Sequence, residues 1–290
     1  MNNNIVLYII ATLIWGSTWI AITFQLGKVP LEASVVYRFV LASGILFAYG
    51  LIRGLKFRFS PREHGWMALQ GLLFFSLTYV CAYLAASYIT SGLVAVMFSF
   101  IVFLNMFGMR LFFGTLIRRE ALVGAVFGVL GIALIFLPTL GPLSSQPNPL
   151  LGFSYALMGA IFAALGNMVT IRNYGKGIAV APLNAYAMLY GALFVIVYVI
   201  LKGGAFAFDW SGKYVLSLLY LSIVGTALVF GVYVTLMGRI GADRAGYLAV
   251  AVPVVALMIS TLFEALRWQP VMYVGLACCF AGNVMVLKSR

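Results

Sequence analysis

The sequence contains few charged residues and very few acidic ones. Only 8% of its 290 residues are charged, and only six are Asp or Glu. Soluble domains carry about 25% charged residues, so this composition excludes a soluble globular protein. Histidine is almost absent as well, because the single His64 lies in the segment SPREHGW. Without an HExxH motif, a paired-acid site or a Cys–His arrangement, the sequence predicts no enzyme, no metal site and no cofactor.

Cysteine is also scarce, with three residues in the chain. Cys81, Cys278 and Cys279 all lie in or near apolar segments, where a free thiol behaves as a small hydrophobic group. We therefore predict neither a disulfide nor a metal ligand among them.

Apolar runs are what the sequence has in abundance. Hydrophobic residues make up 64% of the chain, against about 45–50% in soluble domains. The runs are about 20 residues long, the length an α-helix needs to cross a hydrocarbon layer of roughly 30 Å, and they do not alternate as transmembrane β-strands do. We predict an all-α integral membrane protein without a soluble domain, with ten spans at residues 5–25, 32–53, 65–86, 91–113, 120–137, 150–171, 180–201, 213–236, 245–265 and 269–287.

The basic residues indicate how the chain is oriented, because cytoplasmic loops carry the excess of Lys and Arg. With the N-terminus inside, the outer side has only Lys28, Lys202, Lys213 and Arg267. The inner side then has thirteen basic residues: Arg53, Lys56, Arg58, Arg62, Arg110, Arg118, Arg119, Arg172, Lys176, Arg239, Arg244, Lys288 and Arg290. We therefore predict that both termini lie in the cytoplasm, with the chain in a bacterial inner membrane.

The net charge of +12 is thus mainly a signal of topology. The basic residues are spread over separate loops, so the sequence gives no support to a nucleic-acid partner. The expected partners are the lipid bilayer and a small-molecule substrate, an amino acid, and we expect the protein to be a monomer.

Weak internal repetition divides the chain into two halves. The segment IWGSTW (14–19) has a loose counterpart in ALGNMV (164–169), and VYRFVLASGILF (36–47) has one in NAYAMLYGALFV (184–195). A repeat with an odd number of spans must re-enter the membrane from the opposite side, so five plus five spans give an inverted pair around a central cavity. We predict a first five-helix repeat over residues 1–140 and a second, inverted one over residues 141–290.

Several motifs follow one another in a characteristic order. IWGSTW precedes the intramembrane pair Arg38-Phe39, then YITSGLVAV (88–96) and GAVFGVLGIALIF (124–136). The second half contains RIGADRAGYLAVAVPVVALMIS (239–260), FEALRWQPV (263–271) and GLACCFAGNVMVL (275–287). This order resembles the EamA type of the drug/metabolite transporter superfamily over nearly the whole chain. The resemblance implies a bundle in which the fifth and tenth spans support the outside and the other eight surround a cavity.

The chain departs from this family pattern around the fourth span. Members often have a proline in the fourth and ninth spans; Pro253 fills the second site, whereas the first-half counterpart reads SFIVF (99–103). The family's common Gly-Glu after the fourth span is Gly114-Thr115 here, although Glu264 stands near the corresponding place in the second half. These departures leave the fold prediction intact and bear on gating near the fourth span.

Helical spacing places polar and aromatic side chains of several spans on shared faces. One face of the first span carries Thr12, Trp15, Trp19 and Thr23. Such stripes more often serve packing between helices than ligand binding, but a tryptophan in mid-membrane needs a partner for its N–H, which a cavity supplies. The candidate cavity residues are Trp15, Trp19, Arg38, Tyr79, Tyr83, Phe98, Asn167, Tyr186, Tyr233, Tyr247 and Pro253.

The fifth and tenth spans look different, since they carry small residues that permit close helix packing. These residues are Gly124, Gly128 and Gly131 in the fifth span, and Ala277, Ala281 and Gly282 in the tenth. This division between lining and packing helices agrees with what the resemblance implies.

Arg38 is the one basic residue predicted inside a span. A guanidinium there costs at least about 2.5–3.5 kcal/mol on insertion scales, so it should face the bundle interior and meet an acceptor. One interpretation is that Arg38 attracts or binds a substrate carboxylate. The other is that it lies near the outer end of the second span, after Glu32, and pairs with backbone carbonyls or with a carboxylate at the rim.

The missing acids also constrain the mechanism. Proton-coupled carriers commonly place Asp or Glu inside the membrane, and exporters of lipophilic cations need a buried anion, yet all six acids lie at or near predicted span ends. An aromatic cavity that is uncharged or weakly positive suits a zwitterion with a ring. The first hypothesis is a secondary transporter that exports aromatic and other apolar amino acids by alternating access, as facilitated efflux.

Alternatives to this hypothesis stay open. The same fold can export another small metabolite or a drug, and Glu32 or Glu264 at the rim can couple protons in an antiporter. Polar stripes also line pores, so a channel is a further alternative, which saturable, counterflow-stimulated transport separates from a carrier.

Overall fold

The computed structural model describes residues 2–140, 148–240, 245, 247–266 and 268–288. In these residues all regular structure is helical, which confirms the predicted all-α class. Nine of the described helical segments are long and apolar enough to cross a membrane. The ninth predicted span is the shorter apolar helix α13 (Leu248–Phe263), which follows the segment 241–246, described only at Ala245.

The observed helices agree with the predicted spans to within a few residues at most ends. The first half consists of α1 (Asn2–Thr23), α2 (Leu31–Ile52), α3 (Pro61–Gln70), η1 (Gly71–Leu77), α4 (Thr78–Ala86), α5 (Ser91–Ser99), α6 (Ile101–Phe113), α7 (Arg119–Phe136) and η2 (Leu137–Leu140). The second half consists of α8 (Pro149–Tyr174), α9 (Val180–Leu201), α10 (Gly212–Leu219), η3 (Tyr220–Leu228), α11 (Val229–Ile240), α13 and α14 (Pro270–Lys288).

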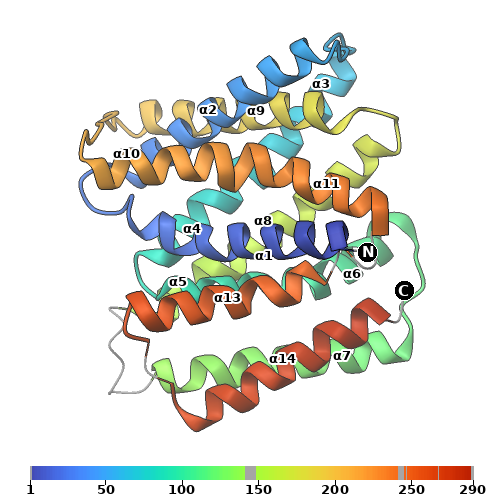
Figure 1. The fold of residues 1–290 in the computed structure, drawn as a ribbon, viewed down its shortest axis with the longest axis vertical. Coiled ribbons are helices and arrows are strands. Elements are labelled where there is room, and N and C mark those ends of the chain that lie inside the picture. The colour runs from blue at the N-terminus through green and yellow to red at the C-terminus, as the bar shows by residue number, and fades with distance from the viewer. Residues whose placement is uncertain (1, 141–147, 241–244, 246, 267, 289–290) are drawn as a thin grey trace.

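Some sequence predictions fall outside the described residues. The predicted boundary between the repeats, 140/141, adjoins the segment 141–147, and three of the basic residues used for orientation, Arg244, Arg267 and Arg290, also lie outside. Helix α1 begins and α14 ends at the same end of the bundle (Figure 1). An even number of crossings produces this arrangement.

Local signals explain several helix ends. At the start of α3, Ser60 and Glu63 form a reciprocal capping box, and Pro61 occupies the first turn, where its missing N–H costs nothing. At the end of α6, Gly114 has φ +70°, a left-handed conformation that glycine adopts without strain. These residues stop the helices close to where the apolar runs end.

The third and eighth spans share an unusual backbone. Each contains a π-helical stretch, η1 and η3, between two α-helical parts. In both spans a threonine near the end of the stretch donates to a carbonyl five residues earlier: Thr78 to Leu73 at 2.8 Å and Thr226 to Leu221 at 2.7 Å. Such π-turns are frequent at functional sites, and here they occur at corresponding positions of the two halves.

The helices α7 and α14 pack on each other at one edge of the bundle (Figure 1). A Cβ on Gly131 would lie 2.5 Å from the carbonyl oxygen of Gly275, and one on Gly124 would lie 2.7 Å from that of Gly282. Real side chains do not come so near a backbone oxygen, so glycine is required where the two helices touch. The predicted packing role of the glycines is confirmed, with Gly275 as a contact that the predicted set lacks, whereas the predicted Ala277 and Ala281 are exposed.

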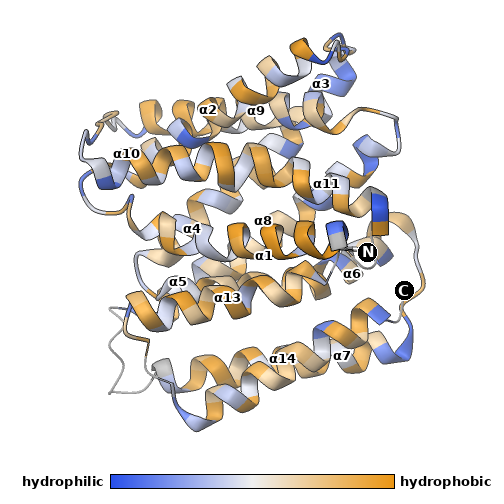
Figure 2. Cartoon of the chain, viewed as in Figure 1, coloured by the Kyte–Doolittle hydropathy of each residue, from blue (hydrophilic) through white to orange (hydrophobic). Residues whose placement is uncertain are grey.

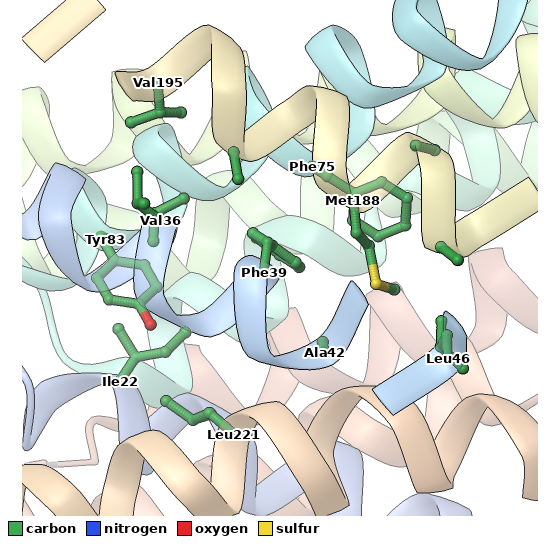
Figure 3. Packing of buried hydrophobic residues seen from close by; sticks show 14 of the residues in the cluster. Ile22, Val36, Phe39, Ala42, Leu46, Phe75, Tyr83, Met188, Val195 and Leu221 are labelled. Carbon is green, nitrogen blue, oxygen red and sulfur yellow. The ribbon is translucent and has the colours of Figure 1, made fainter. Parts of the chain in front are cut away.

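Side chains also distinguish the bundle's interior from its surface. One buried cluster joins α2, η1 and α9 through Val36, Phe39, Phe75, Met188 and Val195 (Figure 3). Hydrophobic residues cover most of the helix lengths, and hydrophilic ones gather near the helix ends (Figure 2). Many large apolar side chains on the outside are exposed, as expected where lipid, and not water, is the surroundings.

Candidate functional site

A cavity of ≈ 250 Å³ lies between the helices of both halves. Its walls come from α1, α2, η1, α4, α5, α6, α8, η3 and α13. Helices α7 and α14 contribute no lining residue, as expected, but neither does α9, so the expectation that the other eight spans surround the cavity is wrong for the seventh. The lining residues are Trp15, Thr18, Trp19, Ile22, Arg38, Phe74, Thr78, Tyr79, Ala82, Ala95, Phe98, Ser99, Ile101, Ala163, Gly225, Ala249, Val252 and Pro253.

The wall on α1 contains both tryptophans. The ring of Trp19 lies 4.9 Å from that of Phe98 on α5, and the ring of Trp15 lies 5.1 Å from that of Tyr233 on α11. The prediction that Thr12 and Thr23 share the lining face of α1 with the tryptophans is wrong. Those threonines bond to backbone carbonyls of their own helix and are replaced in the lining by Thr18 and Ile22, which occupy i+3 and i+7 relative to Trp15.

Arg38 enters the cavity from α2 and is only 2% exposed. Its Nε and Nη2 donate to Oγ1 of Thr226 in η3, at 3.3 and 3.2 Å. The guanidinium also lies over the ring of Tyr79, 4.7 Å from the centroid, a cation–π geometry. Its Nη1 is buried and has no hydrogen-bond partner among the described residues, and the hydroxyl of Tyr83 lies close to the guanidinium.

The hydrogen-bond partner of Arg38 is neither a backbone carbonyl nor a carboxylate at the rim, the two partners that the second interpretation predicts. Thr226 supplies a hydroxyl oxygen, because its own hydrogen is donated to the carbonyl of Leu221. No ion pair joins Arg38 to a described carboxylate. Glu32, the acid expected nearby, lies 3.7 Å from Lys202 instead.

Further polar groups on the lining also remain open to a ligand. The indole N–H of Trp15, that of Trp19 and the hydroxyl of Tyr79 make no hydrogen bond to another described residue. The hydroxyls of Thr18, Thr78 and Ser99 donate to carbonyls of their own helices, and so retain only their oxygen lone pairs. The lining therefore offers free donors, neutral acceptors and a single charge, which is positive.

Pro253 breaks the hydrogen-bond ladder of α13 beside the cavity. Proline has no N–H, so the carbonyl of residue 249, four positions earlier, lacks its usual partner. Ala249 itself lines the cavity. The missing bond therefore leaves one more neutral acceptor in the part of α13 that lines the cavity.

Five of the predicted residues do not line the cavity. Tyr83 is fully buried and donates to Gln25 at 2.6 Å. Asn167 donates to Asn105 at 3.2 Å, and Tyr186 donates to the carbonyl of Phe57 at 3.0 Å. The remaining two pack in hydrophobic clusters beside the cavity: Tyr233 against Trp15, and Tyr247 near Val250.

The sequence analysis also missed several lining residues. Ala163 and Gly225 are small and carry no chemical signal that separates lining from packing. Thr78 and Ser99 resemble ordinary helix hydroxyls in the sequence, and Phe74 resembles a lipid-facing residue. The hydroxyls of Thr78 and Thr226 each donate to the carbonyl five residues earlier, in the π-helical stretches. These bonds depend on the folded backbone, so the sequence alone does not show them.

The two halves are joined at the end of the bundle where α1 ends. The carboxylate of Glu264, after α13, accepts from the backbone N–H of Ser91 at 3.0 and 3.1 Å and from its hydroxyl. Because it caps the N-terminus of α5, the contact is favoured by the helix dipole. In the loop before α10, hydrogen bonds from the hydroxyl and N–H of Ser211 hold the pKa of Asp209 below its ordinary value, so this carboxylate stays charged beside Lys28, at 3.9 Å.

The sequence of both halves identifies the family of this chain. The model of the EamA-like transporter family matches residues 3–137 and again residues 150–288. The chain belongs to the EamA-like transporter family. It is a multi-pass membrane protein, and the two matches correspond to the two halves that line the cavity together.

Relatives of this EamA protein include named transporters. It is 24% identical to YoaV of Bacillus subtilis, an uncharacterized transporter, over 92% of this chain and 91% of the relative. It is 24% identical to a probable amino-acid metabolite efflux pump of Escherichia coli, over 98% and 96%. YedA, an uncharacterized inner membrane transporter of E. coli, is 28% identical over 86% and 79%. Family and relatives point to a transporter and away from an enzyme.

A solved crystal structure has the same fold. It aligns over all of this chain and 98% of its own length, with a TM-score of 0.69 and 16% sequence identity. At this identity the likeness concerns the fold alone.

Proposed function

We propose that this protein is a secondary transporter that exports aromatic and other apolar amino acids across the bacterial inner membrane. In this proposal its function is similar to that of YddG, a bacterial exporter of aromatic amino acids. The observation that carries it is the cavity, which combines the rings of Trp15, Trp19, Tyr79 and Phe98 with one buried arginine. Rings provide flat apolar contacts for an aromatic side chain, and the arginine provides a donor for a carboxylate.

The size of the cavity supports a substrate of this class. An apolar cavity of about 150 Å³ holds one benzene molecule. The ≈ 250 Å³ found here leaves room for one ring together with the backbone atoms of an amino acid. A much larger drug molecule requires expansion of the site.

The proposed mechanism is alternating access between two inverted five-helix repeats, 1–140 and 141–290, which rock around the cavity. The contact of Glu264 with Ser91 joins the halves at one end, and in the proposed orientation, with both termini in the cytoplasm, this end faces outward. We propose that the halves move relative to each other at this contact when the site opens outward.

Facilitated efflux is the proposed energetics. No acid occurs among the lining residues, so the cavity itself supplies no carboxylate to carry a proton. The substrate gradient then drives net movement, and the same pathway catalyses exchange.

The test is uptake and counterflow of radiolabelled tryptophan and phenylalanine, with an aliphatic amino acid for comparison, in proteoliposomes that contain the purified protein. We expect saturable exchange of the aromatic substrates with the same rate in the presence and absence of a pH gradient. If exchange requires the pH gradient, the mechanism is proton antiport and not facilitated efflux. No exchange of any amino acid by correctly folded protein contradicts the proposal and favours export of another metabolite or drug.

A further inference from the structure

The charge of the cavity lining is unbalanced. Arg38 is the one charged residue among those that line the cavity, and only 2% of its surface is exposed. The described carboxylates with recorded contacts bond elsewhere: Glu32 to Lys202, Glu63 to Ser60, Asp209 to Ser211 and Glu264 to Ser91. A buried cation without a counter-ion is unfavourable, so the site gains most from a ligand that brings one negative charge.

The unused hydrogen-bonding groups point to the same kind of ligand. Nη1 of Arg38 is buried without a hydrogen-bond partner among the described residues, and the indole N–H groups of Trp15 and Trp19 are two further donors on the lining. A carboxylate accepts from several donors at once, and a charged donor gives the strongest of these bonds. An ammonium group meets no carboxylate in this lining; it meets hydroxyl oxygens, the carbonyl of Ala249 and ring faces, and the charge of Arg38 repels it.

The position of the arginine is fixed before any ligand arrives. Thr226 holds Nε and Nη2, and the ring of Tyr79 lies against the guanidinium face. These contacts come from both halves of the protein, since Tyr79 belongs to α4 and Thr226 to η3. The guanidinium is therefore held in one orientation, so a ligand binds it without the entropy cost of ordering a flexible side chain.

We propose that the cavity recognises its substrate by the ring and the carboxylate and does not require the amino group. This inference rests on the proposed function, because it concerns the same site. Its consequence is a further substrate class, aromatic monocarboxylates that lack an ammonium group. Aromatic amines, which carry a positive charge and no carboxylate, are excluded by the arginine.

Equilibrium competition tests this selectivity directly. Labelled tryptophan is bound to the purified full-length protein in detergent at neutral pH, and indole-3-propionate and tryptamine compete for it. The first competitor lacks the ammonium group and the second lacks the carboxylate, while both retain the indole ring. We expect indole-3-propionate to bind within about tenfold of tryptophan, and tryptamine to bind at least about tenfold more weakly than indole-3-propionate. A larger loss for indole-3-propionate, or a smaller one for tryptamine, overturns the proposal.

Three variants assign the selectivity to the arginine. Arg38→Gln removes the charge and should remove the preference for indole-3-propionate over tryptamine, while Arg38→Lys should keep it. Arg58→Gln, at an exposed position, should leave all three affinities unchanged. A folded Arg38→Gln variant with the wild-type preference contradicts the proposal, and if that variant does not fold, the wild-type competition decides alone.

The failure of the proposed function has a different signature. If tryptophan does not bind, amino-acid export fails, and calorimetric titration of the wild type with indole-3-propionate then tests the inference by itself. If tryptophan binds and indole-3-propionate does not, export stands and the inference fails.

Discussion

Arg38 shows how one residue can serve both the fold and the site. Its guanidinium in α2 bonds to Thr226 in η3 and lies over Tyr79 in α4, so it links three helices around the cavity. These contacts leave Nη1 unpaired, an arrangement that costs free energy in the empty protein. In the proposed site, a substrate carboxylate that reaches this nitrogen recovers that cost.

The two tryptophans of α1 carry the first prediction. Replacing both with leucine (Trp15→Leu with Trp19→Leu) keeps an apolar side chain but removes both rings from the lining. Aromatic contacts are worth about 0.5–1.5 kcal/mol each, so we expect about five- to hundredfold weaker tryptophan binding. Uptake in proteoliposomes and size-exclusion profiles of the purified protein measure transport and folding.

The control for this pair is Trp210→Leu, at a loop residue that is 83% exposed. It should change neither transport nor folding. A folded double variant that transports tryptophan at the wild-type rate would refute the assignment of the tryptophans to the substrate path.

At this scale the sequence predicts some lining residues and not others. Trp15, Trp19 and Arg38 were recognisable because each is costly in mid-membrane unless a cavity or a partner satisfies it. Tyr83 carries the same signal, but Gln25, in the turn after α1, satisfies its hydroxyl. Helical spacing tells which residues share a face and says nothing about which neighbour fills that face.

Among the helices, the main division is between those that line the cavity and those that pack outside it. The apolar runs predict the spans well, because ten crossings of similar length leave little freedom in where helices begin and end. The π-turns η1 and η3 had no counterpart in the predictions. They depend on backbone hydrogen bonds, which the pattern of apolar residues does not encode.

The contact between α7 and α14 carries the second prediction. Gly131→Ala places a Cβ 2.5 Å from the carbonyl oxygen of Gly275 and 2.6 Å from the backbone nitrogen of Cys279, so the helices must move apart. Overpacking of this kind costs about 1–3 kcal/mol. We expect a lower thermal unfolding temperature in detergent and, because neither helix lines the cavity, an unchanged affinity for tryptophan.

Gly44→Ala is the matched control, because a Cβ on Gly44 meets nothing within 4 Å. This substitution should leave the protein as stable as the wild type or slightly more stable, since alanine favours a helix by about 0.5–1 kcal/mol over glycine. Equal effects of the two substitutions contradict the close-packing account.

For the whole molecule, the central feature is that both halves build one cavity. Trp15, Arg38 and Phe98 come from the first half, and Ala163, Gly225 and Pro253 from the second. Relative movement of the halves therefore changes the site itself, as alternating access requires. The sequence predicted the two halves from weak repeats, and the family model matches each half once; their inverted relation stays a prediction.

The central claim is that the substrate passes through this cavity. The most direct test is to fill the cavity with a larger side chain and to measure tryptophan counterflow. Ala249, on α13, lines the cavity and is partly exposed to it, so Ala249→Phe puts a ring into the space that we assign to the substrate. Ala133→Phe makes the same change on the exposed face of α7. We expect Ala249→Phe to reduce counterflow at least about tenfold while Ala133→Phe retains the wild-type rate. Undiminished counterflow by folded Ala249→Phe protein would contradict the assignment of this cavity to the substrate path.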